Sequence, residues 1–255
     1  MNHGSLFSGG GGFDLAAEMM GWNNIFHCEI DPFCNRILNH YWPDAQSINN
    51  IREFNAKQFK GKIDILTGGF PCQPFSEAGK RKGTNDNRYL WPDMLRVIQE
   101  IQPTWVVAEN VYGIVSWNEG MVFEQVHAGL EAAGYEVQAF VLPACGVDAP
   151  HRRYRVWFVA HTNSTRLEGG AYTREAARSW QRQVKQFARL CRSGYWRNWP
   201  TQSPVCRGDD GLPCELDGIS VSKWRRESIK MYGNAIVPQV ALQIFNVIEQ
   251  MRISD

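Results

Sequence analysis

A cysteine held on a stiff loop is the first residue of this sequence that could do covalent chemistry. Cys72 lies in residues 68–76, GGFPCQPFS, directly after the apolar run at residues 63–66. The glycines and prolines on either side let neither a helix nor a strand continue, so the loop begins where a strand ends. In open α/β sheets, ligands and chemistry collect at this place. Taken alone, Cys72 would more often be a buried structural cysteine.

An acid and two arginines stand beside other apolar runs. Glu109 follows residues 105–108, and Arg153 and Arg155 open the run at residues 156–159. Two positions apart on an extended chain, the arginines would face the same side. Each residue has an ordinary alternative, as a strand-end acid or an edge-strand charge. Together, a thiol, an acid and two cations suit addition to an electron-poor ring that carries a carbonyl and a ring nitrogen.

A glycine loop near the N-terminus indicates a second ligand. Residues 5–7 are a short strand candidate, residues 8–14 read SGGGGFD, and a helix is expected to end at Gly21. Such a unit brings backbone N–H groups close to a nucleotide-like ligand, although a flexible loop is nearly as good an interpretation. Glu29 stands 20 residues after Gly9 (29 − 9) at the end of the next strand, residues 24–28. An acid there typically holds ribose hydroxyls, and its charge argues against a phosphate-rich ligand.

Strands alternate with helices along the first part of the chain. The patterns predict further strands at residues 63–67, 105–108, 137–141 and 156–159, and helices at residues 32–41, 92–101 and 118–133. This alternation predicts an α/β fold with a doubly wound, largely parallel, Rossmann-like sheet. Apolar residues at helical spacing between 236 and 251 predict a C-terminal helix that packs back against the first domain.

A basic segment interrupts this pattern. Between residues 163 and 199, eight Lys and Arg residues, among them Arg178 and Arg182, face two acids, while the whole chain has a net charge of +1. Two acids cannot pair with eight bases, which disfavours a solvated helix held by salt bridges. Interleaved tyrosines and tryptophans favour a nucleic-acid surface instead.

The cysteine pattern and hydropathy bound the class of protein. The seven cysteines are odd in number and contain no Cys-x-x-Cys pair, so neither a metal site nor a disulfide framework is expected. No signal segment and no membrane-spanning apolar run is seen. We therefore expect a cytoplasmic protein.

Five ordered blocks resemble the DNA (cytosine-5) methyltransferases. They are FSGGGGF at 7–13, GFPCQPFS at 69–76 with GKRKG at 79–83, ENV at 109–111, HRRYR at 151–155 and GNAIVP at 233–238. The resemblance implies a methyltransferase sheet with a small inserted target-recognition region. Its expected domains are a catalytic and S-adenosylmethionine-binding domain at 1–162, a DNA-binding region at 163–227, and a C-terminal segment at 228–255 that packs back.

The resemblance also implies catalytic roles. Cys72 would add to carbon 6 of a cytosine flipped out of the duplex. Glu109 would hydrogen-bond ring nitrogen 3 and the amino group, Arg155 would hold the ring carbonyl, and Arg153 would lie beside the same site. Carbon 5 would then accept a methyl group from S-adenosyl-L-methionine, leaving S-adenosyl-L-homocysteine, before its proton and Cys72 depart.

Cofactor and DNA contacts are implied in the same way. The cofactor positions are Phe7, Gly9, Gly11, Gly12, Glu29, Ile30, Asn50, Ile51, Pro71, Leu90 and Asn234. The DNA positions are Gln73, Ser76 and Arg88, on a loop expected to close over the base, with Arg178 and Arg182 in the basic segment. Three departures from the family pattern stand out, because Ile30 replaces an aromatic residue, Asn50 an aspartate and His151 a glutamine.

The resemblance predicts double-stranded DNA as the partner of a monomeric, nucleoid-associated enzyme from a bacterial or phage-infected cell, with a restriction endonuclease as a candidate companion. A transfer-RNA cytosine-5 methyltransferase shares this chemistry, but the chain lacks the Cys-Phe-Thr signature of that branch. A catalytically silent DNA-binding protein would not need Cys72, Glu109 and Arg155 together. A cysteine hydrolase would need a paired histidine and would leave the glycine loop unexplained.

Overall fold

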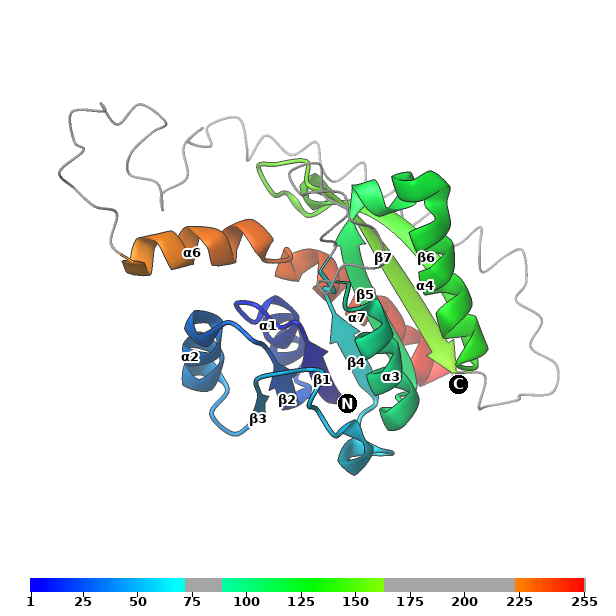
Figure 1. Ribbon diagram of the computed structural model, residues 1–255, viewed down its shortest axis with the longest axis horizontal. Coiled ribbons are helices and arrows are strands. Elements are labelled where there is room, and N and C mark those ends of the chain that lie inside the picture. The colour runs from blue at the N-terminus through cyan, green and yellow to red at the C-terminus, as the bar shows by residue number, and fades with distance from the viewer. Residues whose placement is uncertain (72–88, 163–222, 255) are drawn as a thin grey trace.

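A single mixed sheet organises the chain (Figure 1). The computed structural model describes residues 1–71, 89–162 and 223–254. Within them the strands are β1 (Asn2–Leu6), β2 (Asn23–Cys28), β3 (Gln46–Ile48), β4 (Ile65–Gly68), β5 (Trp105–Val111), β6 (Tyr135–Pro143) and β7 (Tyr154–Thr162). They lie in the order β3-β2-β1-β4-β5-β7-β6. The neighbouring strands among β3, β2, β1, β4 and β5 pair in parallel, whereas β7 is antiparallel to both β5 and β6.

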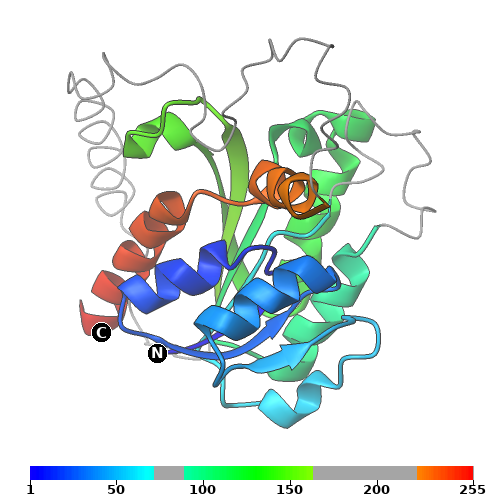
Figure 2. The same cartoon turned by 90° about the vertical axis from the view of Figure 1, so that its left-hand side faces the viewer.

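Helices cover both faces of this sheet (Figure 2). They are α1 (Gly12–Met19), α2 (Pro32–Tyr41), α3 (Trp91–Ile101), α4 (Met121–Ala132), α6 (Lys223–Asn234) and α7 (Pro238–Ser254). Short 3-10 turns, η1 (Ala56–Phe59), η3 (Tyr112–Val115), η4 (Trp117–Gly120) and η5 (Ala144–Val147), join them. One apolar core lies under α3 and α4, and the other joins α1 and α7 to the opposite face. The predicted doubly wound α/β fold is therefore confirmed.

The C-terminal helix packs against the first helix after the glycine loop. Phe245 of α7 is fully buried, and its ring centroid lies 4.8 Å from that of Trp22 and 6.4 Å from that of Phe13. Ala16 and Ala17 of α1 are small and fully buried, which lets the two helices approach. The apolar stripe read from residues 236–251 thus faces the sheet from the same side as α1.

A few element boundaries differ from the predicted ones. Helix α4 begins at Met121 rather than at residue 118, because Asn118 and Glu119 adopt positive φ angles that break a helix. Strand β3 and helix α6 were not predicted. The predicted target-recognition region lies almost wholly outside the described residues, apart from the first residues of α6.

Buried polar side chains join the central strands. His3 of β1 is fully buried, with Nδ1 2.6 Å from Asn24 Oδ1 and Nε2 2.8 Å from Thr67 Oγ1. Burial lowers the pKa of His3 to about 4, so the ring is neutral and links β1 to β2 and β4 without a charge. Asp14 on α1 is also fully buried, neither of its carboxyl oxygens has a hydrogen-bond partner among the described residues, and burial raises its pKa to about 7.

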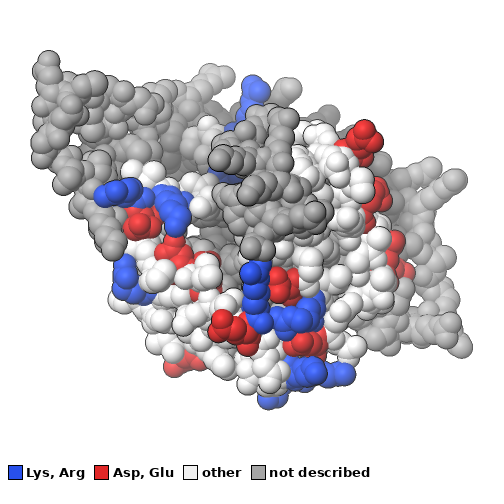
Figure 3. Space-filling view, viewed as in Figure 1, with Lys and Arg blue, Asp and Glu red and all other residues white. Residues whose placement is uncertain are grey.

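The described surface mixes both signs of charge. Figure 3 shows Lys and Arg side chains interspersed with Asp and Glu over the visible described face. Arg96 Nη1 lies 3.0 Å from Glu100 Oε1 on α3, and Arg52 Nε lies 3.6 Å from Asp93 Oδ2. None of the helices within the described ranges has the length and hydropathy needed to span a bilayer.

Candidate active site

Parallel strands deliver the predicted site residues to one edge of the sheet. Strands β1, β2 and β4 end at Leu6, Cys28 and Gly68, and the glycine loop, Glu29 and residues 69–71 follow them directly. Glu109 lies near the same end of β5. The carboxyl ends of parallel strands form the usual ligand crevice of open α/β sheets.

Glu29 is fixed by two backbone N–H groups. Gly9 N donates to Glu29 Oε2 at 2.8 Å, and Asp31 N donates to Oε1 at 2.8 Å. Each carboxylate oxygen has a second lone pair that can accept a hydroxyl. Ile30 follows with its side chain 74% exposed, so it offers an apolar surface beside an oriented acid. This arrangement suits a ribose next to a flat, apolar ring.

The glycine loop is shaped by two positions that tolerate few other residues. Gly9 has a φ of 55° and open space around the place of a Cβ, whereas Gly11 has a φ of 82° and a Cβ there would lie 2.3 Å from the Trp42 ring. Phe7 also has a positive φ, of 53°, so the chain turns sharply as it leaves β1. The loop therefore leaves an open space at Gly9 and packs tightly at Gly11.

The other residues predicted to contact a cofactor differ in their surroundings. Asn50 uses its side chain locally, donating to Glu53 Oε1 at 2.6 Å and accepting from Arg52 N at 3.1 Å, and Ile51 is buried in the core. Asn234 is exposed, at the end of α6. Pro71 and Leu90 are half-buried at the two ends of the segment 72–88.

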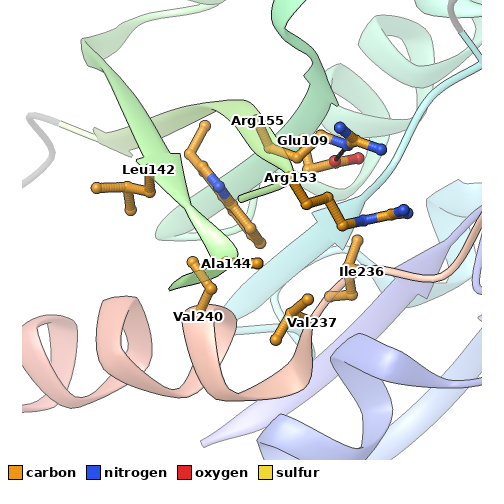
Figure 4. Close-up of a pocket in the computed structure, with 9 residues that line it drawn as sticks. Glu109, Leu142, Ala144, Arg153, Arg155, Ile236, Val237 and Val240 are labelled. Atoms are coloured by element: carbon orange, nitrogen blue, oxygen red, sulfur yellow. Dashed lines mark ion pairs between the residues drawn. The ribbon is translucent and has the colours of Figure 1, made fainter. Parts of the chain in front are cut away.

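Glu109 is a buried acid with two arginine neighbours (Figure 4). Its Oε1 lies 2.9 Å from Arg155 Nε. Burial raises the pKa of Glu109 to about 7, because loss of water disfavours the carboxylate more than the nearby Arg155 and Arg153 favour it. Glu109 can therefore hold or release a proton near neutral pH, a property common among catalytic acids.

Arg153 connects this acid to the C-terminal segment. Its Nη2 donates to the Gly233 carbonyl at 3.0 Å and to the Ala235 carbonyl at 2.6 Å, so it holds the turn on which Asn234 lies. Arg153 has a φ of 38° and precedes β7, so strand alternation does not orient it. Both arginines nevertheless line one pocket with Glu109, and its apolar wall includes Leu142, Trp157, Ile236, Val237 and Val240.

Asn110 received no role from the sequence, although it belongs to the ENV block. Its Nδ2 donates to the Phe70 carbonyl at 3.1 Å, which fixes the chain shortly before residue 72. The same segment approaches the acid closely, since a Cβ on Gly69 would lie 3.3 Å from Glu109 Oε2. The last described residues before Cys72 are thus anchored beside Glu109.

Helix α6 was also missed, because its sequence is strongly polar on average. Lys230 Nζ donates to Asp31 Oδ2 at 2.7 Å, and a Cβ on Gly10 would lie 2.9 Å from Met231 Sδ. These contacts join α6 to the turn after Glu29 and to the glycine loop. The predicted positions Cys72, Gln73, Ser76, Arg88, Arg178 and Arg182 lie outside the described residues.

Comparisons with known proteins were made for both sequence and fold. The sequence model of the family "C-5 cytosine-specific DNA methylase" matches residues 1–193. Type II methyltransferase M.AquIA of a Picosynechococcus strain is 36% identical over 175 residues, which cover 62% of this chain and 70% of that protein. Type II methyltransferase M.HhaI of Haemophilus parahaemolyticus is 32% identical over 164 residues, covering 64% and 50%.

Solved structures share the fold. A prophage-encoded Escherichia coli protein assigned as a DNA modification methyltransferase matches with a TM-score of 0.54 and 27% identity, over 67% of this chain and 49% of that one. The S. pombe Dnmt2 methyltransferase matches with a TM-score of 0.54 and 24% identity, over 67% and 53%, a likeness of fold alone.

The chain is shorter than many of its relatives. It spans 37% of the length of Type II methyltransferase M.PspPI from Psychrobacter, to which it is 36% identical over 154 residues. The family match nevertheless extends over residues 1–193, which is well over half of the chain. The predicted family is therefore confirmed, and the chain belongs to the C-5 cytosine-specific DNA methylases.

Proposed function

We propose that this protein methylates carbon 5 of cytosine in double-stranded DNA with S-adenosylmethionine. The observation that carries the proposal is Glu109, a buried acid with a pKa of about 7 that is paired with Arg155 next to the segment leading to Cys72. An acid of this kind can protonate a ring nitrogen at neutral pH, which activation of a cytosine requires.

The residues around the glycine loop fit the cofactor. The Glu29 carboxylate is held by Gly9 and Asp31 N–H groups and keeps lone pairs for two ribose hydroxyls, while exposed Ile30 can lie against an adenine. The described surroundings of Glu29 favour a ligand without phosphate. S-adenosylmethionine, when bound, supplies the electrophilic methyl group for which carbon 5 of the cytosine is the nucleophile.

The acid and the arginine act on the ring. In its protonated form Glu109 donates to nitrogen 3 of the cytosine, and it passes this proton to the ring as negative charge develops there. The guanidinium of Arg155 can donate to the ring carbonyl while it keeps Glu109 in place through Nε. Both contacts strengthen as the ring gains electrons, so they lower the barrier to addition.

Cys72 provides the nucleophile in this proposal. Its thiolate forms a bond to carbon 6, and the electron pair of the C5–C6 double bond moves to make carbon 5 nucleophilic. After methylation, a base removes the proton from carbon 5, and the returning electron pair restores the double bond and expels the thiolate. The proton on ring nitrogen 3 returns to Glu109, which regenerates the starting acid. A free thiol with a pKa of about 8.5 is only a few per cent ionised at neutral pH, so the site must favour the thiolate.

DNA and its recognition complete the proposal. Gln73, Ser76 and Arg88 would contact DNA around the flipped base, and the basic region 163–227, with Arg178 and Arg182, would read the target as an insert between the catalytic domain 1–162 and the segment 228–255. The Type II names of the relatives support a role beside a restriction endonuclease.

The proposal predicts that Cys72→Ser abolishes methyl transfer. Long, unmethylated duplex DNA of mixed sequence and an equal amount of unmodified transfer RNA are incubated separately with methyl-labelled S-adenosylmethionine. We expect label in DNA from the unchanged protein, none from Cys72→Ser, and normal label from Cys145→Ser, a matched change at a partly buried free cysteine. Label in transfer RNA alone, or equal label from Cys72→Ser, would contradict the proposal.

A further inference from the structure

Two exposed tyrosines lie together at the ends of β5 and β7, one residue beyond the Val111–Arg155 pair. Tyr112, the first residue of η3, is 55% exposed, and Tyr154, the first residue of β7, is 47% exposed. Their ring centroids are 6.3 Å apart, with the ring planes at 53°. A single exposed aromatic residue needs no explanation, but two in mutual contact at the strand ends that carry Glu109 and Arg155 indicate a binding surface.

The pairing of β5 with β7 sets their position. Val111 stands opposite Arg155 as the terminal pair of the ladder, and Tyr112 and Tyr154 are the next residues on the two chains. Each tyrosine Cα is thus about 3.8 Å along the chain from a residue of that pair. The ends of β5 and β7 lie side by side in Figure 1. Because Tyr154 directly precedes Arg155 on β7, its side chain points to the other face of the sheet. The tyrosines therefore lie at the strand ends that carry Glu109 and Arg155, outside the pocket that those two residues line.

The chemistry of this surface favours a nucleic acid over a protein partner. A tyrosine ring offers a flat face on which any base can stack. Contact between the two rings limits their motion, so little rotational freedom is lost on binding. His151 and Arg152, which are exposed, precede Tyr154, and Arg152 forms no ion pair with an acid in the described part of the chain. A positive charge beside aromatic rings suits a polyanion with bases.

We propose that Tyr112 and Tyr154 form a stacking platform for a base that neighbours the target cytosine. The proposal rests on the proposed function, which makes the Glu109–Arg155 pocket the place of the target base. When the target base leaves the helix, the adjoining bases lose one stacking partner, and the platform replaces that contact. A contact between two copies of this chain is the competing use of an exposed aromatic pair.

The test measures binding of a fluorescein-labelled mixed-sequence single strand, and of its duplex, by anisotropy without cofactor. Tyr112→Leu and Tyr154→Leu should each raise Kd about tenfold, and Tyr→Phe at either position should keep it within about twofold, because only the ring is needed. Tyr41→Leu, a matched change at a 67% exposed tyrosine on α2, should have no effect. The slope of log Kd against log salt should stay unchanged in the leucine variants and fall by about one in Arg152→Ala.

Four outcomes decide the matter. Wild-type affinity in both leucine variants overturns the platform, and so does a change confined to self-association in sedimentation. Weaker binding by the leucine variants with no methyl transfer by the unchanged protein supports the platform and rejects the proposed activity. Methyl transfer by the unchanged protein with undiminished binding by the leucine variants rejects the platform alone.

Discussion

Burial and charge oppose each other at Glu109, and burial prevails. The side chain is 11% exposed and lies 2.9 Å from an arginine that would, near a protein surface, hold its pKa below the usual range. Its pKa is instead raised to about 7, since the fold removes more hydration than Arg155 and Arg153 replace. The carboxyl is therefore mostly protonated below pH 7 and mostly ionised above it.

This shift predicts the pH dependence of methyl transfer. If protonated Glu109 donates to the ring, its contribution is complete below pH 7 and falls about tenfold per unit above it. Glu109→Gln keeps a hydrogen-bond donor but has no proton to transfer, so its single-turnover rate should be lower by about 10²–10⁴ at pH 6. The ratio of wild-type to variant rate should then decline as pH rises through about 7.

The control for this prediction is Glu124→Gln, the same change at an exposed acid on α4. Its rate should equal the wild-type rate at every pH. A wild-type to Glu109→Gln ratio that stays constant between pH 6 and 9 would show that the proton of Glu109 is not what sets the pH dependence.

At the level of elements, Arg153 joins the start of β7 to the turn after α6 by hydrogen bonds, and two roles for this residue can be distinguished. The sequence suggests a residue beside the base, while the two hydrogen bonds to Gly233 and Ala235 carbonyls indicate a residue that positions the turn carrying Asn234. Arg153→Lys keeps the charge but loses the planar group that reaches both carbonyls.

We expect Arg153→Lys to act on the cofactor. Charged hydrogen bonds of this kind are worth about 1.5–3 kcal/mol, so KM for S-adenosylmethionine should rise at least tenfold while KM for DNA changes less than about twofold. Arg152→Lys, the same change one residue earlier and exposed, should alter neither constant. A fall in kcat with both KM values unchanged would instead place Arg153 on the base. Initial-rate kinetics with each substrate varied distinguishes these results.

The sequence predicts elements well where a single segment carries its own signal. Helix α2 matches residues 32–41 at both ends, because Pro32 at its start and the N-cap Asp31, whose side chain accepts from Phe33 N, define the boundary locally. Strand β3 has three residues, none of them buried, so no periodicity marks it. Helix α6 is stabilised by contacts with Asp31 and Gly10, which lie about 200 residues earlier and cannot be read from its own composition.

The site was predictable to a similar degree. Residue types at strand ends indicate Glu29 and Glu109, because parallel strands bring their ends together whatever their order in the sheet. The role of Asn110 depends on its distance to the Phe70 carbonyl, and the pKa of Glu109 depends on how deeply it is buried. Neither this distance nor this depth of burial can be predicted from a short stretch of sequence.

For the whole molecule, stability should depend on the seam between α1 and α7. Phe245→Ala removes a fully buried ring that contacts Trp22 and Phe13, and it should lower the free energy of unfolding by about 3–5 kcal/mol. Met251→Ala, a change on the same helix at a 40% exposed side chain, should cost less than about 0.5 kcal/mol. Urea denaturation of both variants measures the difference, and equal losses would show that α7 is only loosely docked.

The same seam affects how the protein matures on the ribosome. Helix α1 is made well before its partner α7, residues 238–254, so the apolar side of the glycine-loop helix stays uncovered until α7 has been made. Chains fold from the N-terminus as they emerge, and uncovered apolar surface attracts chaperones or other nascent chains. Nascent chains that stop before residue 238 should therefore stay bound to chaperones that recognise apolar surface. Chains that include α7 should be released from these chaperones, and they should gain the ability to bind S-adenosylmethionine at the same length.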